Sequence, residues 1–423
     1  MRNLFGRAEV ALPSRLVLII AGAAVALGAA CRGRPAPPKP YLAFVANSQS
    51  NSVAAVDVAT FRVVATIPVA PEHPEQITVR PGSHEVWVLG GTSGVSVIRF
   101  PELDVRKTFD VGPLARSLTF SRDGRRAFIF SPVEGQVVFL DCDQLRETAR
   151  VRLRAPSTVR SLSDLFTQDN TALLAAVATG QATGPPLGEV ALTPNGKTLL
   201  ISDATPSNRV HLVDVDSQKL LGSVEVGKDP GPMVVLPDSS KAFVADTGEP
   251  KVSVVDIASR QLLSHLEMAA LPSALLLKPD GGEIFVLSAQ GSSLSIVDAF
   301  HNNVELNMTT GREPSSAVIR RNQSVLYIAN AGDGSVTALE VENRTVLSST
   351  HAGTEPRSLA LTPDERYLVV ADAASSDVAI LRTDVTDAAP SGPSPTSRTA
   401  LVTTVPVGAR PVDVVVPDWP WKE

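Results

Sequence analysis

The sequence contains few of the residues that build disulfide frameworks and metal centres. Two cysteines and six histidines in 423 residues exclude a disulfide framework, a multi-thiolate metal site and a multi-haem centre. There is no basic excess either, because 38 lysines and arginines stand against 44 aspartates and glutamates, for a formal net charge of −6. A nucleic-acid surface needs such an excess, so we expect no nucleic-acid partner.

Familiar enzyme motifs are also missing from the sequence. It has no G-x-S-x-G nucleophile elbow, no H-E-x-x-H helix and no phosphate-binding P-loop. Cys142, which follows Asp141 at the end of a predicted strand, is interpreted as a small packed residue rather than a reactive thiol. We expect no cofactor and no resident metal, and we favour a protein that is not an enzyme.

One apolar run stands out near the N-terminus. Residues 16–27 (LVLIIAGAAVAL) follow three arginines and precede small residues and Cys31, an order typical of an export signal. The run is shorter than the roughly 20 residues of a spanning helix. The segment resembles a bacterial lipoprotein signal, which implies that Cys31 is lipidated and becomes the mature N-terminus. Ordinary cleavage after Ala30 and an uncleaved anchor are the alternatives.

Residues 1–30 are thus predicted to be an export or lipoprotein signal, and residues 31–40 a proline-rich tether that favours extended conformations. A lipid and a tether predict a protein anchored to a membrane of the bacterial cell envelope and facing the periplasm. Arg32 stands where an acidic residue retains some lipoproteins at the inner membrane, so the resemblance favours the outer membrane. A soluble secreted or periplasmic protein is the alternative.

A repeated pattern fills the chain from residue 41 to residue 419. Each unit holds three short β-rich runs and is preceded by a fourth, with turns supplied by 33 prolines and 28 glycines. The units start at Ala43, Val86, Ala127, Leu199, Ala242, Ile284, Leu326 and Leu368. These starts are 43, 41, 72, 43, 42, 42 and 42 residues apart. Four short strands in about 42 residues predict one blade of a β-propeller.

Aspartate and asparagine recur at two fixed places in the units. One set ends the second strand: Asn47, Asp203, Asp246, Asn330 and Asp372. The other set follows the third strand: Asp57, Asp141, Asp214, Asp256 and Asp298. Both sets are interpreted as Asx turns, in which the side chain accepts a hydrogen bond from the backbone two residues on. This interpretation makes them structural rather than catalytic carboxylates.

The units resemble YVTN-type β-propeller repeats, most closely in AFVANSQSNSVAAVDVATFRVVATIPVA from Ala43 and LYIANAGDGSVTALEVENRTV from Leu326. The resemblance implies an all-β fold with a single propeller over residues 41–419. The first unit lacks its inner strand, and residues 411–417 (PVDVVVP) form an inner strand with no unit after it. We therefore predict eight four-stranded blades, closed by pairing of the C-terminal strand with the N-terminal unit. Seven blades, the commoner number in the family, are the alternative.

Two insertions interrupt the period. Residues 154–184 form either a helix, because Ser161 and Asp164 have the spacing of a capping box, or an extra hairpin. Residues 383–400 are rich in proline and serine and predict a loop.

The mouth of the propeller channel is the default place for a ligand. Strands alternate in direction, so the turns after the second strands and the segments that lead into the inner strands share one face. Arg116, Arg357 and Arg410 in those segments are candidates to bind an anion through forked hydrogen bonds. The alternative is that they pair with nearby acids and only line a wet channel. These acids are Glu75, Glu355 and Asp413, and the same segments also carry Asp229 and Glu313.

Two histidines, His73 and His351, fall on the same predicted face, two blades apart across the closure. They are candidates to hold a metal or to face a haem, although no carboxylate–histidine spacing supports such a site. A solvated pair without a common ligand is the other interpretation.

The sequence thus favours a non-catalytic, envelope-anchored, monomeric propeller that binds an envelope protein or a small ligand at its mouth. Resemblance to other propellers implies two alternatives. One is an enzyme, either a lactonase-like hydrolase or an oxidoreductase. The other is haem binding or delivery, as in the eight-bladed d1-type haem domains of nitrite reductases.

Overall fold

The computed structural model describes residues 39–70, 72–90, 94–154, 188–204, 208–385, 398–419 and 421. The predicted signal, Cys31, most of the tether and most of both insertions lie outside the described residues, so their interpretations stay predictions. All regular structure in the described ranges is β-strand. These ranges contain no helix that is long and apolar enough to cross a membrane.

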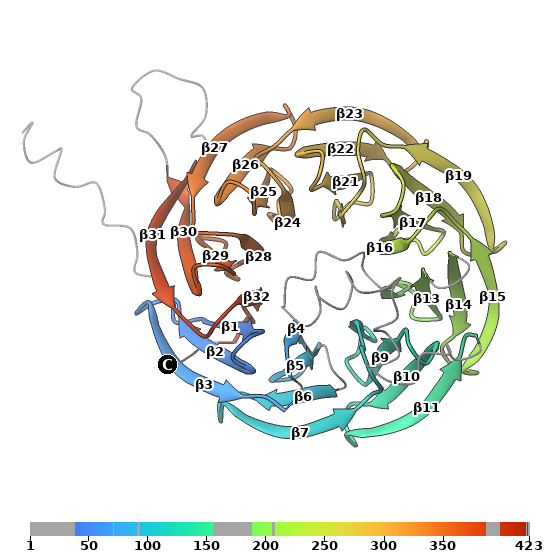
Figure 1. The fold of residues 1–423 in the computed structure, drawn as a ribbon, viewed down its shortest axis with the longest axis horizontal. Helices are drawn as coiled ribbons and strands as arrows, with labels where there is room; N and C mark the ends of the chain where they lie inside the picture. The colour runs from blue at the N-terminus through green and yellow to red at the C-terminus, as the bar shows by residue number, and fades with distance from the viewer. Residues whose placement is uncertain are drawn as a thin grey trace, which may run out of the picture. The chain divides into compact units, whose positions relative to one another are not determined.

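The strands form eight four-stranded antiparallel sheets, which are the blades of a ring (Figure 1). From the channel outward, blade 1 holds β32 (Pro411–Val415), β1 (Leu42–Asn47), β2 (Ser52–Asp57) and β3 (Arg62–Pro68). Blade 2 holds β4 (Pro74–Val79), β5 (Glu85–Gly90), β6 (Gly94–Arg99) and β7 (Asp104–Asp110). Blade 3 holds β8 (Ser117–Phe120), β9 (Arg126–Ser131), β10 (Gln136–Asp141) and β11 (Arg146–Arg152). Blade 4 holds β12 (Val190–Leu192), β13 (Thr198–Asp203), β14 (Arg209–Asp214) and β15 (Lys219–Glu225).

The other four blades follow in chain order. Blade 5 holds β16 (Pro230–Val235), β17 (Lys241–Asp246), β18 (Lys251–Asp256) and β19 (Gln261–Glu267). Blade 6 holds β20 (Ala274–Leu277), β21 (Glu283–Ser288), β22 (Ser293–Asp298) and β23 (Asn303–Thr309). Blade 7 holds β24 (Pro314–Ile319), β25 (Val325–Asn330), β26 (Ser335–Glu340) and β27 (Thr345–His351). Blade 8 holds β28 (Pro356–Leu361), β29 (Tyr367–Asp372), β30 (Asp377–Val385) and β31 (Arg398–Pro406).

The core of the ring lies between the blades. The middle strands are covered on both faces by neighbouring blades, so β1, β2 and β5 are buried at every residue. The outermost strand β3 instead alternates between exposed and half-buried residues over most of its length. Each pair of neighbouring blades shares one apolar cluster. Between blades 2 and 3, Trp87 stacks on Phe109 and meets Phe120 edge-on, with ring centroids 5.8 and 5.2 Å apart.

The ring closes as the sequence predicts. The C-terminal strand β32 pairs antiparallel with β1, with Val415 opposite Phe44 and Val414 opposite Val45. This pairing supplies the inner strand that the first unit lacks. The count of eight blades is confirmed, and the alternative of seven blades is wrong.

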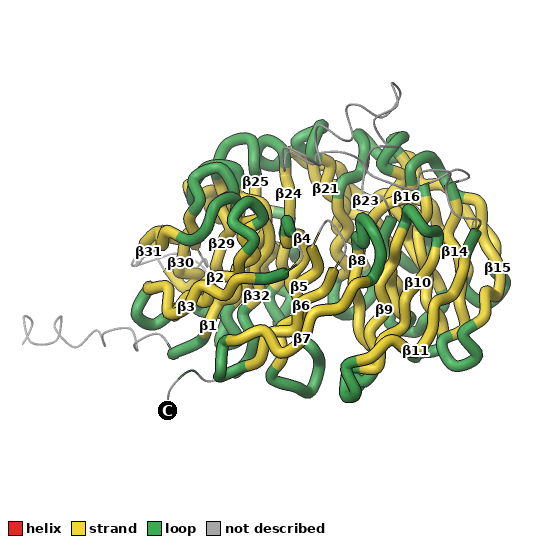
Figure 2. The backbone as a smooth tube through the Cα atoms, turned by 60° about the horizontal axis from the view of Figure 1, so that its bottom comes forward, coloured by secondary structure: helices red, strands yellow, loops and turns green. Residues whose placement is uncertain are grey.

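The two ends of the described chain meet on one face of the ring. Trp419 packs against Phe44 and Phe100, with ring centroids 6.3 and 5.2 Å apart. The backbone amide of Trp421 donates a hydrogen bond to the carbonyl of Pro40 at 2.7 Å. Inner strands end on this face and second strands begin on it, so it is opposite to the channel mouth (Figure 2).

The Asx turns predicted after the third strands are confirmed. Asp57 accepts a hydrogen bond from the amide of Ala59 at 2.8 Å. Asp141 and Asp298 likewise accept bonds from the amides two residues on, at 3.0 and 2.7 Å. These carboxylates therefore shape the hairpins that lead to the outermost strands.

The Asx turns predicted at the ends of the second strands are wrong where the turn is described. In blade 5, the amide of Gly248 donates to the carbonyl of Lys228 at 3.0 Å, in the segment that leads into β16. The corresponding amides of blades 1, 7 and 8 do the same. Asp246 is instead fully buried under Gly227, where a side chain on that glycine would collide with its carboxylate. These buried residues at the ends of the second strands pack against the segments that form the channel mouth.

Asp372 in blade 8 lacks the partner that this buried position has in blade 5. Asp246 accepts a hydrogen bond from Ser253, seven residues later, at 2.7 Å. The residue at the corresponding place in blade 8 is Ala379, and neither carboxylate oxygen of Asp372 has a hydrogen bond of normal geometry to a described residue. Burial, with a contribution from the charge of Asp377, raises the pKa of Asp372 from 3.8 to about 8.

The raised pKa predicts how Asp372→Asn changes the dependence of stability on pH. The folded chain holds this proton between pH 4 and 8 while the unfolded chain releases it, so the contribution of Asp372 is greatest below pH 4 and is lost as pH rises towards 8. We expect the difference in free energy of unfolding between Asp372→Asn and the natural chain to shift in favour of the variant as pH rises. The shift should reach about 1–3 kcal/mol at pH 8. Urea unfolding at pH 5 and 8 measures the difference, and equal differences at both values would contradict it.

Candidate functional site

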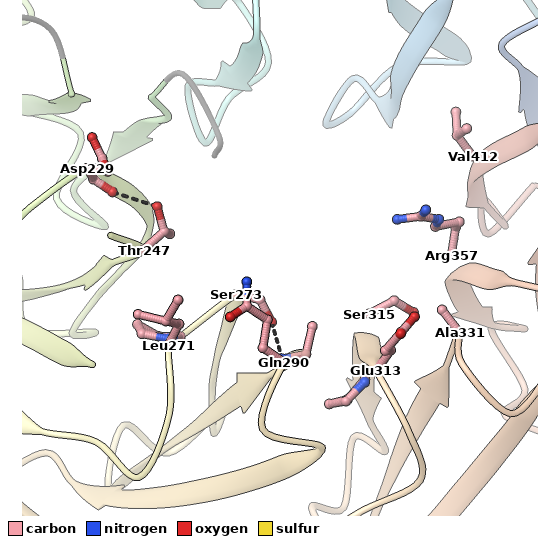
Figure 3. A pocket seen from close by; sticks show the side chains of 13 residues that line it. Asp229, Thr247, Leu271, Ser273, Gln290, Glu313, Ser315, Ala331, Arg357 and Val412 are labelled. Atoms are coloured by element: carbon pink, nitrogen blue, oxygen red, sulfur yellow. Dashed lines mark hydrogen bonds between the residues drawn. The ribbon is translucent and has the colours of Figure 1, made fainter. Parts of the chain in front are cut away.

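A cavity of about 710 Å³ opens at the channel mouth, on the face that the sequence predicts (Figure 3). Its lining comes from the segments that lead into β16, β20 and β24, from the first residues of β24 and β28, and from the turns after β17, β21 and β25. Val412 of β32 adds one further contact surface. The cavity is thus built by blades 5 to 8, with one residue from blade 1.

Backbone geometry turns the side chains of these segments toward the mouth. The inner strands of blades 7 and 8 begin with a β-bulge, between Pro314 and Ser316 and between Pro356 and Ser358. A bulge re-aims the extra residue, which is Ser315 in blade 7 and Arg357 in blade 8. Both line the cavity.

The residues that precede the inner strands β16 and β24 have a left-handed backbone. Asp229 and Glu313 have φ values of 53° and 52°, which cost a non-glycine residue of order 1 kcal/mol. Their carbonyls accept hydrogen bonds from the amides of Thr247 at 3.0 Å and Ala331 at 2.9 Å, which hold this conformation. The two carboxylates are therefore fixed at the mouth by their own backbone.

The three predicted arginines are each paired with an acid, as the alternative interpretation has it. Arg116 forms an ion pair with Glu75. Arg357 donates from Nε to Glu355 at 2.9 Å and also from Nη2. Arg410 shares the same glutamate, with 3.4 Å between Nη2 and Oε1. Only Arg357 lines the cavity, while the other two side chains are 14% and 12% exposed.

Asp413 is not an arginine partner, and this part of the prediction is wrong. Its carboxylate accepts hydrogen bonds from the hydroxyl of Ser358 at 2.7 Å and from the amide of Ile77 at 2.9 Å. It therefore ties β32 to the inner strands on both sides of it, and burial raises its pKa. Glu189 does the same for blade 5 by accepting the amide of Met233 at 2.9 Å, and burial raises its pKa to about 7.

The two predicted histidines lie at different radial positions. His73 precedes the inner strand β4, where its amide donates to Asn51 at 2.9 Å. His351 is the exposed last residue of the outermost strand β27. The end of an outermost strand lies at the rim of the ring, whereas the start of an inner strand lies at its channel. The structure therefore does not place both histidines at the channel mouth.

The described residues that line the cavity provide neither a group of metal ligands nor a histidine for a haem iron. No group of three or more histidine, cysteine, aspartate or glutamate side chains in the described ranges is placed to hold a metal ion. A haem iron takes an axial ligand such as histidine, and the cavity lining contains none. We derive no function through either group.

Three polar side chains of the cavity form no hydrogen bond or ion pair with any described residue. They are Asp229, Gln290 and Glu313, from blades 5, 6 and 7. In Arg357 of blade 8, Nε and Nη2 donate hydrogen bonds to Glu355, and Nη1 remains available to a ligand. From the sequence, Asp229 and Glu313 are only two of several acids in the segments that lead into the inner strands, and no pattern marks Gln290.

Comparison with known proteins agrees with this architecture. Residues 233–394 match the family described as Lactonase, 7-bladed beta-propeller. The chain is a β-propeller. The matched segment includes Gln290, Glu313 and Arg357 of the cavity, although this propeller has eight blades. No curated protein matches it.

Solved structures share the fold of the propeller at low sequence identity. Dihydro-heme d1 dehydrogenase NirN in complex with DHE has a TM-score of 0.67 at 13% identity, over 92% of this chain and 78% of that one. A functionally unknown protein from Desulfotomaculum acetoxidans has a TM-score of 0.56 at 14% identity, over 79% and 99%. Hydrazine synthase from Kuenenia stuttgartiensis has a TM-score of 0.50 at 19% identity, over 71% and 88%. At these identities the likeness is one of fold.

Proposed function

We propose that the propeller is a binding protein that holds a small polar ligand in the cavity at its channel mouth, without converting it. The observation that carries this proposal is the cavity itself. Its volume of about 710 Å³ lies within the range of small-molecule sites, which is about 300–1,000 Å³. Four successive blades offer it polar groups with unused hydrogen-bonding capacity, and the ring fixes their positions.

Filling the cavity tests the proposal. Ala331, in the turn after β25, lines the cavity, whereas Ala374, in the corresponding turn of blade 8, is exposed and does not. We expect Ala331→Trp to abolish retention of small molecules from envelope extracts, and Ala374→Trp to preserve it. Native mass spectrometry after equilibrium dialysis measures the bound mass, and melting temperatures show whether both variants fold. Equal retention by both folded variants would place the ligand elsewhere.

We also propose that the protein is anchored in the bacterial envelope by a lipid on Cys31, with the outer membrane favoured over the inner. The order of arginines, apolar run, small residues and cysteine in the first 31 residues supports this. We expect Cys31→Ser to move the protein from the membrane fraction to the soluble periplasmic fraction. Labelling with radioactive palmitate checks the lipid directly, and equal labelling of both chains would refute the anchor.

Hydrolysis of a lactone is a second candidate, supported by the family match over residues 233–394. In that reaction Glu313 would take a proton from water as the water oxygen attacks the lactone carbonyl. Arg357 would stabilise the oxyanion, and the ring oxygen would leave with a proton. Incubation with a panel of sugar lactones distinguishes the two candidate functions. Hydrolysis by the natural chain that is lost in Glu313→Gln would support the hydrolase.

A further inference from the structure

The cavity carries charges of opposite sign on different blades. Arg357 lies on one side and Asp229 on the far side, with Gln290 and Leu271 between them (Figure 3). Glu313 of blade 7 carries a second negative charge, between Gln290 and Arg357 (Figure 3). From this arrangement, and resting on the proposed function, we infer that the ligand is an elongated zwitterion with a protonated amine at one end and a carboxylate at the other.

The positive side is a pair of guanidinium groups that share one carboxylate. Arg357 and Arg410 both bind Glu355, so two positive charges face one negative charge and one positive charge remains. The Nε of Arg410 is buried without a hydrogen-bonding partner among the described residues. Glu355 holds Arg357 through Nε and Nη2, which fixes the orientation of the remaining nitrogen. A guanidinium fixed in this way suits a carboxylate.

The far side carries the carboxylate of Asp229, and the carboxylate of Glu313 lies between Gln290 and Arg357 (Figure 3). Neither has a cationic partner among the described residues. Asp229 packs over Gly248, where a Cβ would collide with its carboxylate, and the carboxylate carbon of Glu313 lies 3.1 Å from where a Cβ on Gly332 would stand. Of the neighbouring cations, Arg312 donates to the carbonyl of Gly332 at 2.7 Å. The glycines thus leave room for two negative charges at the mouth, which favours a cationic group on the ligand.

The stretch between the two sides fits the middle of such a molecule. Gln290 has a free amide that can both donate and accept, and Leu271 and Pro272 give apolar surface. A short peptide with free ends and an ω-amino acid both match this order of ammonium, neutral spacer and carboxylate. They differ in whether amides or methylenes fill the spacer, so Gln290 favours a peptide only if its amide contributes to binding.

Calorimetric titration of the full-length protein tests the inference. The probes are di-, tri- and tetra-alanine, their N-acetylated and C-amidated forms, and 6-aminohexanoate. We expect at least one unmodified probe to bind, and each blocked form to bind about tenfold or more weakly, because each loses one charge-assisted hydrogen bond. Preference for a peptide over 6-aminohexanoate that is lost in Gln290→Ala would identify the peptide.

Matched variants assign the two ends of the ligand. Asp229→Asn should weaken the unmodified probe about tenfold and leave the N-acetylated form unchanged. Glu342→Gln, an exposed carboxylate in the turn between β26 and β27, should change neither. Arg357→Met should weaken the unmodified probe and leave the C-amidated form unchanged.

The outcomes separate this inference from the proposed function. If blocked and unmodified probes bind equally, or no probe binds, the zwitterion is overturned. Retention of extract molecules that Ala331→Trp abolishes would still uphold the cavity as a binding site.

Discussion

Replacing Arg80 with methionine is expected to lower the free energy of unfolding by about 3–5 kcal/mol, the usual cost of breaking a buried ion pair. Arg80 and Glu85 are 9% and 7% exposed in their side chains and lie 3.0 Å apart. The guanidinium also donates to the carbonyl of Gly124 at 2.7 Å and to that of Cys142 at 3.1 Å. One side chain therefore joins the turns of blades 2 and 3, and its loss leaves several buried acceptors without a donor.

Arg99→Met is the matched control for this prediction. Arg99 pairs with Asp104 at 2.6 Å, but the two side chains are 41% and 52% exposed. Exposed ion pairs contribute little to stability, so urea unfolding should separate the two variants clearly. In Arg80→Met, Glu85 keeps Arg106 as a partner at 2.7 Å, so most of the loss is expected from the buried carbonyls of Gly124 and Cys142. Equal losses for Arg80→Met and Arg99→Met would show that burial does not govern this pair.

Removal of residues 409–423 is expected to prevent cooperative folding. It takes away β32, so β1 loses its pairing partner on the channel side. It also removes Val414 and Trp419, which are 3% and 9% exposed, and each such side chain contributes about 1.5–3 kcal/mol through burial. Together with the lost hydrogen bonds this approaches the whole stability of a typical protein, about 5–15 kcal/mol.

A rearranged chain tests whether closure rather than chain length is responsible. Residues 409–423 placed before residue 39 through a short linker keep β32 beside β1, because the amide of Trp421 already contacts the carbonyl of Pro40. We expect this chain to unfold cooperatively near the melting temperature of the natural one. A truncated chain that melts cooperatively at the same temperature would show that the ring does not depend on closure.

The blade count and the closure could be predicted because they follow from counting. The period is near 42 residues, the first unit lacks an inner strand, and the C-terminal end has an inner strand to spare. These facts leave one arrangement, and β32 pairs with β1 accordingly. The turns at Asp57 and Asp298 were predictable for a similar reason, since an Asx turn depends only on residues next to it in sequence. Local and periodic signals therefore carry the fold.

The details of the mouth could not be predicted because they depend on neighbours from other parts of the chain. Asp246 has the same sequence context as a turn residue, but the amide that an Asx turn would use is taken by the carbonyl of Lys228. Asp413 lies near Arg410 in sequence, yet it bonds Ser358 of blade 8. Such contacts between strands and blades decide which acids keep a free carboxylate. These contacts join residues far apart in the chain, so they cannot be read from the sequence.

The meeting of Pro40 and Trp421 has a practical consequence for handling the protein. Both described ends leave the ring on the side away from the cavity. An affinity tag or a biosensor surface attached at either end would leave the opening unobstructed, so immobilisation should preserve access for small solutes.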